Sequence, residues 1–226
     1  MHREAGRIWQ SVKDLFYYNR VGPALAKELP NAGLRLGVYV FLAAGLVSAI
    51  LTIAITAFSM HMAAFEYSMI SEVSDIGEAE VQWGGLLPVA LFQFLFLVPF
   101  GLVFSLVYEG VVYKAMRLSG GKGTFAQQYY LSSLVALSMA ISSVLGLFGP
   151  VPCLRLPAAL ALLLLVLYFV FFVNVRAYQV VHDVSFLHPF AIVLLLAIPR
   201  LLVVMFIVNA AAPFFSLPEF ISYSGV

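Results

Sequence analysis

The stretch Ala159-Leu-Ala-Leu-Leu-Leu-Leu-Val-Leu-Tyr-Phe-Val-Phe-Phe-Val173 decides the fold of this chain. It belongs to a segment, Leu156–Val175, that no charged residue interrupts and that Arg155 and Arg176 flank. A helix rises about 1.5 Å per residue, so about 20 residues cross a hydrocarbon core about 30 Å thick. A soluble core helix keeps a polar face, and this segment has none. We therefore predict a membrane-spanning helix whose flanking arginines extend toward the head groups.

The composition of the whole chain agrees with a membrane protein. Hydrophobic residues make up 63% of it and charged residues 10%, and the mean hydropathy is +1.01. Soluble domains carry about 25% charged residues, so a water-soluble domain is excluded. A formal net charge of +1 argues against a nucleic-acid partner. The single cysteine, Cys153, excludes an intramolecular disulfide, and the charged start of the chain is unlike a cleavable signal peptide.

The chain contains five apolar segments long enough to span a bilayer. They are Leu36–Met60, Leu86–Tyr113, Tyr129–Phe148, Leu156–Val175 and Phe190–Ala212. We therefore predict an all-α integral membrane protein, with a five-helix domain over 34–213 and a short non-cytoplasmic tail over 214–226. Pro99 is expected to kink the second helix. Small residues four apart, at Ser132, Ala136 and Ala140, indicate that the third helix is buried among the others.

Residues 1–33 form a sizeable polar segment before the first span. Apolar residues recur there at helical spacing, at Ile8, Trp9, Val12, Leu15 and Phe16, and charged residues occupy the other faces. This pattern predicts a short amphipathic helix. Two interpretations remain open: the helix lies in the membrane interface, or it is solvated and packs on the rest of the protein.

Basic residues are distributed unevenly between the two sides of a five-span chain. One side receives Arg3, Arg7, Lys13, Arg20, Lys27, Arg35, Lys114, Arg117, Lys122 and Arg176, and the other receives only Arg155. Because lysine and arginine concentrate in cytoplasmic loops, the N-terminus is expected to be cytoplasmic and the C-terminus outside or lumenal. The membrane that the protein spans would be the plasma membrane in a prokaryote. Lys114, Arg117 and Lys122 form the centre of the expected basic cytoplasmic face.

The segment between the first two spans, about 61–85, is acidic. Its carboxylates are Glu66, Glu72, Asp75, Glu78 and Glu80, and it contains no lysine or arginine. Their spacing does not follow the pattern of a calcium-binding loop. We interpret the segment as a solvated loop or exposed helix, with no metal bound.

Arg200 is the residue that most needs an explanation, because it follows Pro199 near the middle of the fifth span. An arginine at this depth costs about 2.5–3.5 kcal/mol on insertion scales, so it should face the bundle beside a carboxylate, carbonyls or water. Glu109, in the cytoplasmic half of the second span, is the expected carboxylate. The pair is either a structural clamp between two spans or part of an ion, substrate or head-group site. Arg176, with Asn174, is expected to anchor the end of the fourth span.

Other polar patterns predict local structure rather than chemistry. His182, Asp183 and His188 do not share a helix face, as a metal site there would require. The run Gly120–Thr124 lacks the spacing of a phosphate-binding P-loop, and Thr124 is better interpreted as a helix N-cap in a capping box with Gln127. No catalytic motif is present, so we expect neither an enzyme nor a cofactor.

Several motifs together resemble one family. They are Asp14-Leu-Phe-Tyr-Tyr-Asn19, the basic loop Gly120–Phe125 followed by Gln127-Gln-Tyr-Tyr130, the turn Gly149-Pro-Val-Pro152, and Ala177-Tyr-Gln-Val-Val-His-Asp-Val184 at the end of a long span. This arrangement is similar to the YIP family of five-span membrane proteins that interact with Ypt/Rab GTPases, and particularly to its prokaryotic members. The chain differs at His188-Pro-Phe-Ala191, where the family usually has Lys-Ala after the histidine, and in its short N-terminal region.

The resemblance implies a membrane scaffold or adaptor without catalysis, which recruits protein partners or forms homo-oligomers. Independently of the resemblance, the basic face is expected to attract membrane lipids, anionic ones included, at about 1 kcal/mol per basic residue near the surface. A small transporter or channel that uses Arg200 and Glu109 is the alternative from another class. An accessory subunit of a larger membrane complex is a third hypothesis.

Overall fold

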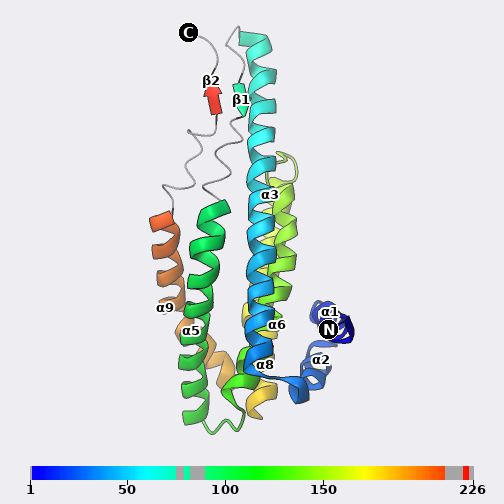
Figure 1. Cartoon of the computed structure of the whole chain (residues 1–226), viewed down its shortest axis with the longest axis vertical. Helices are drawn as coiled ribbons and strands as arrows, with labels where there is room; N and C mark the ends of the chain where they lie inside the picture. Colours follow the sequence, from blue (N-terminus) through cyan, green and yellow to red (C-terminus); the bar gives the residue numbers. More distant parts are fainter. Residues whose placement is uncertain (1, 75–78, 82–89, 212–220, 224–226) are drawn as a thin grey trace.

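A computed structural model describes residues 2–74, 79–81, 90–211 and 221–223. Almost all of these residues are helical (Figure 1). The two strands among them, β1 (Ala79–Val81) and β2 (Ile221–Tyr223), pair antiparallel, with Glu80 opposite Ser222. The start of the second expected span, residues 86–89, and most of the expected tail lie outside the described residues.

The helices follow one another with short connections. Two short helices, α1 (His2–Asp14) and α2 (Val21–Glu28), and a 3-10 turn, η1 (Leu29–Asn31), precede the longest helix, α3 (Leu34–Ser74). The next helices are α5 (Val98–Leu118), preceded by a π-helical turn η3 (Gln93–Leu97), and α6 (Phe125–Ser142), followed by a 3-10 turn η4 (Ser143–Phe148). The last are α7 (Arg155–Tyr168), the π-helical turn η5 (Phe169–Val173), α8 (Asn174–His182) and α9 (Leu187–Ala211).

Within the described part of the chain, four helices are long and apolar enough to cross a membrane. They cover Leu34–Glu66, Ala90–Leu118, Phe125–Phe148 and Arg155–His182, whereas α9 contributes a shorter apolar stretch, Leu187–Val203. Large apolar side chains lie on their outer surfaces. On α5, for example, Val103, Val107 and Val111 recur every four residues and are 60%, 61% and 48% exposed. Such a large apolar surface is unfavourable in water and is compatible with contact with lipid.

The boundaries of two helices differ from those expected. The first continues past Met60 to Ser74, so part of the acidic segment expected as a loop or exposed helix is helical; residues 75–78 and 82–89 of that segment lie outside the described part. The fourth continues past Val175 to His182, because no proline or glycine interrupts it. It ends at Asp183, whose φ of 52° is left-handed.

Pro99 is accommodated by an irregularity rather than by a break. It is the second residue of α5, which follows directly after the π-helical turn Gln93–Leu97. Proline cannot donate a backbone hydrogen bond, and a π-helical turn opens the regular hydrogen-bond ladder just before it. The helix from Ala90 to Leu118 therefore continues past the proline.

Helix α6 is the centre of the bundle. In its most apolar window 39% of the residues are buried, against 17% or less in the other three long helices, as its small residues predict. Gly37 of α3 allows this close packing, because a Cβ there would lie 3.1 Å from the Tyr130 Cα. Leu131 and Leu134 of α6 join Phe169 and Val173 in the largest cluster of buried apolar residues.

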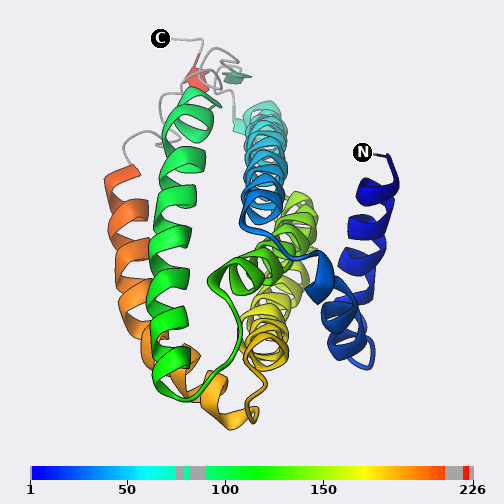
Figure 2. The same ribbon diagram turned by 60° about the horizontal axis from the view of Figure 1, so that its bottom comes forward.

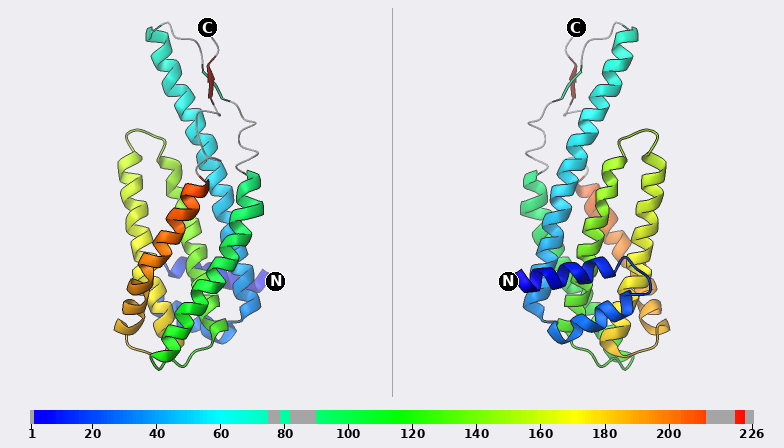
Figure 3. Two further views of the ribbon diagram at one scale, coloured as in Figure 1. Left: turned by 90° about the vertical axis from the view of Figure 1, so that its left-hand side faces the viewer. Right: turned by 90° about the vertical axis from the view of Figure 1, so that its right-hand side faces the viewer.

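The connections and the N-terminal helices define one end of the bundle. In both views of Figure 3, α1 runs crosswise to the long helices near the end at which α3 begins. The connections 119–124 and 183–186 also lie at that end. Figure 2 shows α1 and α2 on one side of the bundle and α5 and α9 on the other. The amphipathic segment thus packs against the helical domain, through contacts of α1 with α6 and of α2 with α8.

Candidate functional site

Glu109 is a buried carboxylate on the inner face of α5. Its side chain is held by two neutral donors from neighbouring helices. Gln128 of α6 donates from Nε2 to Glu109 Oε2 at 2.7 Å and to the Glu109 carbonyl at 2.9 Å. The Tyr178 hydroxyl of α8 donates to Glu109 Oε1 at 2.8 Å. Three helices are therefore joined at one buried acid.

Further hydrogen bonds extend from this acid in two directions. On the α8 side, Asn174 Nδ2 donates to the Tyr178 hydroxyl at 3.2 Å, and Ser132 Oγ donates to Asn174 Oδ1 at 3.4 Å. Toward the loop, His182 Nε2 lies 2.8 Å from Gln128 Oε1. An amide oxygen can only accept, so His182 donates from Nε2. Its buried Nδ1 has no partner among the described residues.

A cavity of about 250 Å³ adjoins this network. Phe41, Phe104 and Val170 contribute apolar parts of its lining. Its polar lining comes from residues of α5, α6, α8 and α9: Ser105, Tyr108, Glu109, Tyr129, Ser132, Ser133, Asn174 and Arg200. The two residues singled out in the sequence, Glu109 of α5 and Arg200 of α9, therefore lie at the same cavity.

Arg200 does not form the direct ion pair with Glu109 that the sequence suggested. Its guanidinium carbon lies 4.9 Å from the centroid of the Tyr108 ring, in a cation–π contact. The ion pairs within the described ranges are Arg7–Glu28, Arg20–Asp14 and Lys122–Asp183. An aromatic face stabilises a cation by about 0.5–2 kcal/mol, which offsets part of the cost of burying an arginine. The cavity thus contains a cation and a carboxylate that are held by different neighbours.

The glycine-rich loop before α6 packs closely on the end of α8. A Cβ at Gly123 would lie 2.4 Å from the Val181 carbonyl oxygen, and one at Gly121 would lie 2.7 Å from His182 Nδ1. Lys122 N donates to the His182 carbonyl at 3.1 Å, and Gly120 has a φ of +88°. Glycine is therefore required here by backbone approach and by a left-handed conformation.

The capping box expected at Thr124 is confirmed. The Thr124 hydroxyl accepts from Gln127 N at 3.3 Å, and Gln127 Oε1 accepts from Thr124 N at 3.0 Å. The cap starts α6 directly after the loop, which places Gln128 and Tyr129 in the first turns of the buried helix.

The basic residues near this loop make few strong contacts. Lys114 is exposed, and Lys122 Nζ forms an exposed ion pair with Asp183 at 3.3 Å. Arg117 donates to the Gly121 carbonyl at 3.0 Å. Arg176 donates to Gln179 at 2.7 Å and lies over the rings of Phe172 and Phe186.

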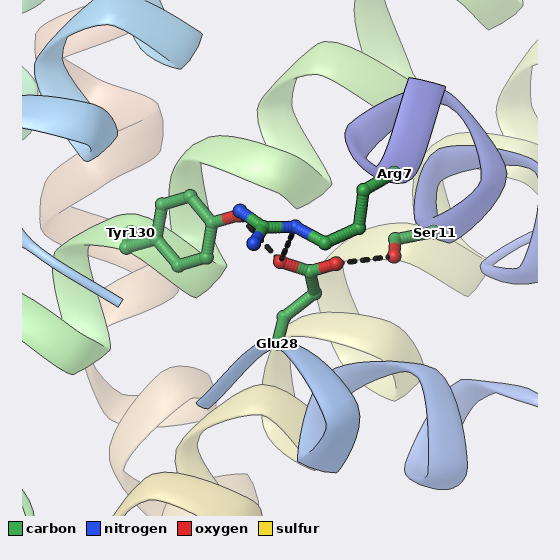
Figure 4. A network of polar contacts seen from close by, with 4 residues as sticks. All are labelled: Arg7, Ser11, Glu28 and Tyr130. Carbon is green, nitrogen blue, oxygen red and sulfur yellow. Dashed lines mark hydrogen bonds and ion pairs between the residues drawn. The ribbon is translucent and has the colours of Figure 1, made fainter. Parts of the chain in front are cut away.

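A second buried acid, Glu28 at the end of α2, was missed by the sequence reasoning. Figure 4 shows it between Arg7, Ser11 and Tyr130. Arg7 Nε lies 3.3 Å from Glu28 Oε2, and the Tyr130 and Ser11 hydroxyls donate to the carboxylate at 2.7 Å each. One signal pointed to it, since Glu28 is the only acidic residue between Asp14 and Glu66.

The histidines and acids near the end of α8 have separate surroundings. His182 is buried against Gln128, Asp183 is exposed, and His188 Nδ1 lies 2.7 Å from Ser185 Oγ. Within the described ranges no three histidine, cysteine or acidic residues gather as a metal site would require.

No protein-family model, curated protein sequence or solved structure matches the chain. The resemblance to the YIP family therefore depends on the motifs alone.

Proposed function

We propose that the protein is a five-span integral membrane scaffold of the YIP type, which recruits protein partners without catalysis at a basic cytoplasmic face. The observation that carries this proposal is the gathering of basic residues at one end of the bundle. Helices α1 and α2, the start of α3, the end of α5 and the connections 119–124 and 183–186 lie at that end. They carry Arg7, Lys13, Lys27, Arg35, Lys114, Arg117 and Lys122. Arg20 lies in the turn between α1 and α2, and Arg176 lies nearby on α8. Arg155 begins α7 at the other end.

The proposal takes α9 as the fifth span and α1 as an interfacial helix. Helix α9 has 25 residues, which is sufficient for a span at the helical rise of about 1.5 Å per residue. Helix α1 runs crosswise to the bundle and exposes Trp9, a residue that favours the membrane interface. With five spans the basic end is cytoplasmic, by the excess of lysine and arginine there.

Labelling of single cysteines tests the orientation. Cys153 is exposed in the turn before α7, at the end opposite the basic face. A membrane-impermeant maleimide should label it in intact cells. Ser119→Cys and Ser185→Cys, each in a Cys153→Ser background, should be labelled only after the membrane is opened. Labelling of Cys153 and Ser119→Cys from the same side would overturn the five-span orientation.

Co-purification after mild detergent extraction tests recruitment. We expect a stoichiometric partner that is lost when Lys114, Arg117 and Lys122 are changed together to glutamine. The matched control is Arg155→Gln, which removes a basic residue from the other end. A partner that survives the triple change, or the absence of any stoichiometric partner, would count against a scaffold that acts through this face.

The cavity at Arg200 favours a second candidate, a small transporter or channel-like protein. A cavity with both a cation and a carboxylate is more typical of a hydrated path than of a sealed bundle. In a Cys153→Ser background, Ser132→Cys lines the cavity and should react with a small charged thiosulfonate. Ser138→Cys, on the same helix but fully buried and outside the cavity lining, should not. If neither cysteine reacts with the thiosulfonate, the result would favour the scaffold.

A further inference from the structure

An apolar groove of about 300 Å³ lies between the crosswise helix α1 and the start of α3. Helix α1 contributes Ala5, Ile8 and Trp9, and α3 contributes most of the opposite wall. That wall and the floor consist of Leu36, Tyr39, Val40, Ala43 and, from α6, Leu137. Every residue of the lining except Tyr39 is apolar, so the groove suits a hydrocarbon chain rather than a polar ligand.

Each wall of the groove carries an aromatic ring with a cation over it. On α1, Lys13 Nζ lies 5.2 Å from the centroid of the Trp9 ring. On α3, the Arg35 guanidinium carbon lies 5.5 Å from the centroid of the Tyr39 ring, and Arg35 Nε donates to the Tyr39 hydroxyl at 3.0 Å. Tryptophan and tyrosine favour the boundary between hydrocarbon and head groups, where an amphiphile has its polar part.

Neither Lys13 nor Arg35 forms an ion pair with a described residue. The three ion pairs found there involve Arg7, Arg20 and Lys122, not Lys13 or Arg35. Arg35 uses only Nε in its hydrogen bond, so its two terminal nitrogens point to no described acceptor. A guanidinium with free donors matches the oxygens of a phosphate.

We propose that the groove binds one anionic phospholipid. An acyl chain lies between Trp9 and Tyr39, Arg35 holds the phosphate, and Lys13 adds positive charge on the opposite wall. Anionic head groups gain roughly 1 kcal/mol from each basic residue near the surface, whereas a zwitterionic lipid gains much less. This inference names a lipid for the basic face and rests on the proposed insertion of the protein in a bilayer.

Trp9 can report on its own lipid neighbours. The chain has two tryptophans, so Trp83→Phe leaves Trp9 as the only one. The variant is reconstituted in phosphatidylcholine nanodiscs that contain the same small fraction of either brominated phosphatidylglycerol or brominated phosphatidylcholine. We expect the anionic lipid to quench Trp9 at least about two-fold more strongly, given the attraction of two basic residues for one anionic head group.

Substitutions separate the head-group contact from the groove. Arg35→Gln should remove the preference for the anionic lipid and leave quenching by brominated phosphatidylcholine unchanged, and Arg35→Lys should restore part of the preference. Ala43→Phe, which fills the groove, should reduce quenching by both lipids. The control is Arg20→Gln, which changes a cation that lies over Tyr17 rather than over either aromatic ring of the groove and should leave the preference intact.

The outcomes of this experiment are distinct. Equal quenching by the two lipids, or a preference that Arg35→Gln does not change, would overturn the inference and leave the scaffold proposal standing. Failure of Trp9 to be quenched by either lipid would overturn both the groove occupant and the interfacial position of α1. Failure to reconstitute into nanodiscs would overturn the proposed membrane insertion itself.

Discussion

Two buried glutamates are stabilised in different ways. Glu28 and Glu109 are 0% and 5% exposed, and each accepts a hydrogen bond from a tyrosine hydroxyl. Glu28 also has a cation, Arg7, at 3.3 Å. Glu109 has Gln128 instead, and Arg200, which lines the same cavity, lies over the Tyr108 ring.

The difference separates an anchor from a candidate site. The Glu28 cluster joins α1, α2 and α6, and its acid has two hydroxyl donors and one cation, so it fixes the N-terminal helices on the bundle. The Glu109 network joins α5, α6 and α8 and borders a cavity, with an arginine that has no carboxylate partner among the described residues. A buried acid with a bound cation is a closed unit, whereas an acid and a cation beside a cavity leave room for water or a ligand.

The largest effect is expected from Glu28→Ala. Removal of one member of a buried ion pair costs about 3–5 kcal/mol, and because Arg7 is 26% exposed and can be partly hydrated we expect about 3 kcal/mol. Far-UV circular dichroism during denaturant titration in lipid–detergent bicelles would measure the loss in unfolding free energy. Asp14→Asn, which removes an exposed ion pair with Arg20, should cost less than about 1 kcal/mol. Similar losses for the two variants would contradict the anchor role.

Gly121→Ala should disturb the Glu109 network, because Gly121 lies in the loop that packs on His182. The new Cβ would lie 2.7 Å from His182 Nδ1, and His182 is bonded to Gln128, which holds Glu109. We expect a loss of about 2 kcal/mol, the usual size of an overpacking effect. The control is Gly110→Ala on α5, where a Cβ meets no atom within 4 Å and stability should not fall. Equal stability of both variants would show that the loop can move away from α8.

Removal of the hydroxyl should cost more stability at Tyr178 than at Tyr130. Tyr178→Phe leaves Glu109 Oε1 without a donor and Asn174 Nδ2 without an acceptor, so we expect a loss of about 2 kcal/mol. Tyr130→Phe leaves Glu28 with Arg7 and Ser11, so the loss should be about 1 kcal/mol. Thermal unfolding in bicelles, read by the same ellipticity signal, would rank the two. The reverse order would mean that the ion pair contributes less than the hydrogen bond from Tyr130.

Much of this fold could be predicted from the sequence. Long apolar runs without charges predict helices, and a capping box predicts where α6 starts, because both signals are local. Arg176 ends the uncharged run at Val175, but a charged residue does not stop a helix, so the fourth helix continues to His182. The extension of α3 to Ser74 follows from the same cause.

The candidate site could be predicted only in part. Arg200 and Glu109 stand out because a charge within an apolar run is costly, and that cost can be judged from the sequence. Their actual neighbours depend on packing between helices far apart in the chain, such as Tyr108 on α5 against Arg200 on α9. Gln128 and Tyr178 are ordinary residues in the sequence, so only the three-dimensional arrangement identifies them as partners of Glu109.

Double-mutant cycles would compare the two acid–base pairs directly. For Arg7→Gln with Glu28→Gln we expect a coupling of about 1–2 kcal/mol, as for residues in contact. For Arg200→Leu with Glu109→Gln the coupling should be smaller, about 0.5 kcal/mol, because the two side chains line one cavity but form no ion pair within the described residues. Unfolding free energies of the wild type, two single variants and one double variant supply each cycle. A strong coupling in the second cycle would restore the structural clamp between α5 and α9.

The smallest effect is expected from Ser132→Ala, at the edge of the cavity. Its hydroxyl donates to Asn174 Oδ1 at 3.4 Å, a length at which a hydrogen bond is weak, so we expect a loss of at most about 0.5 kcal/mol in unfolding free energy. Ser138→Ala, which removes a 3.0 Å bond to the Leu134 carbonyl within the same helix, is the matched control. A loss above about 1.5 kcal/mol for Ser132→Ala alone would mean that this serine orients Asn174 and, through it, Tyr178. The side chains of the Glu109 network would then satisfy one another, as those of the Glu28 cluster do. The cavity would be a packing defect beside a structural anchor.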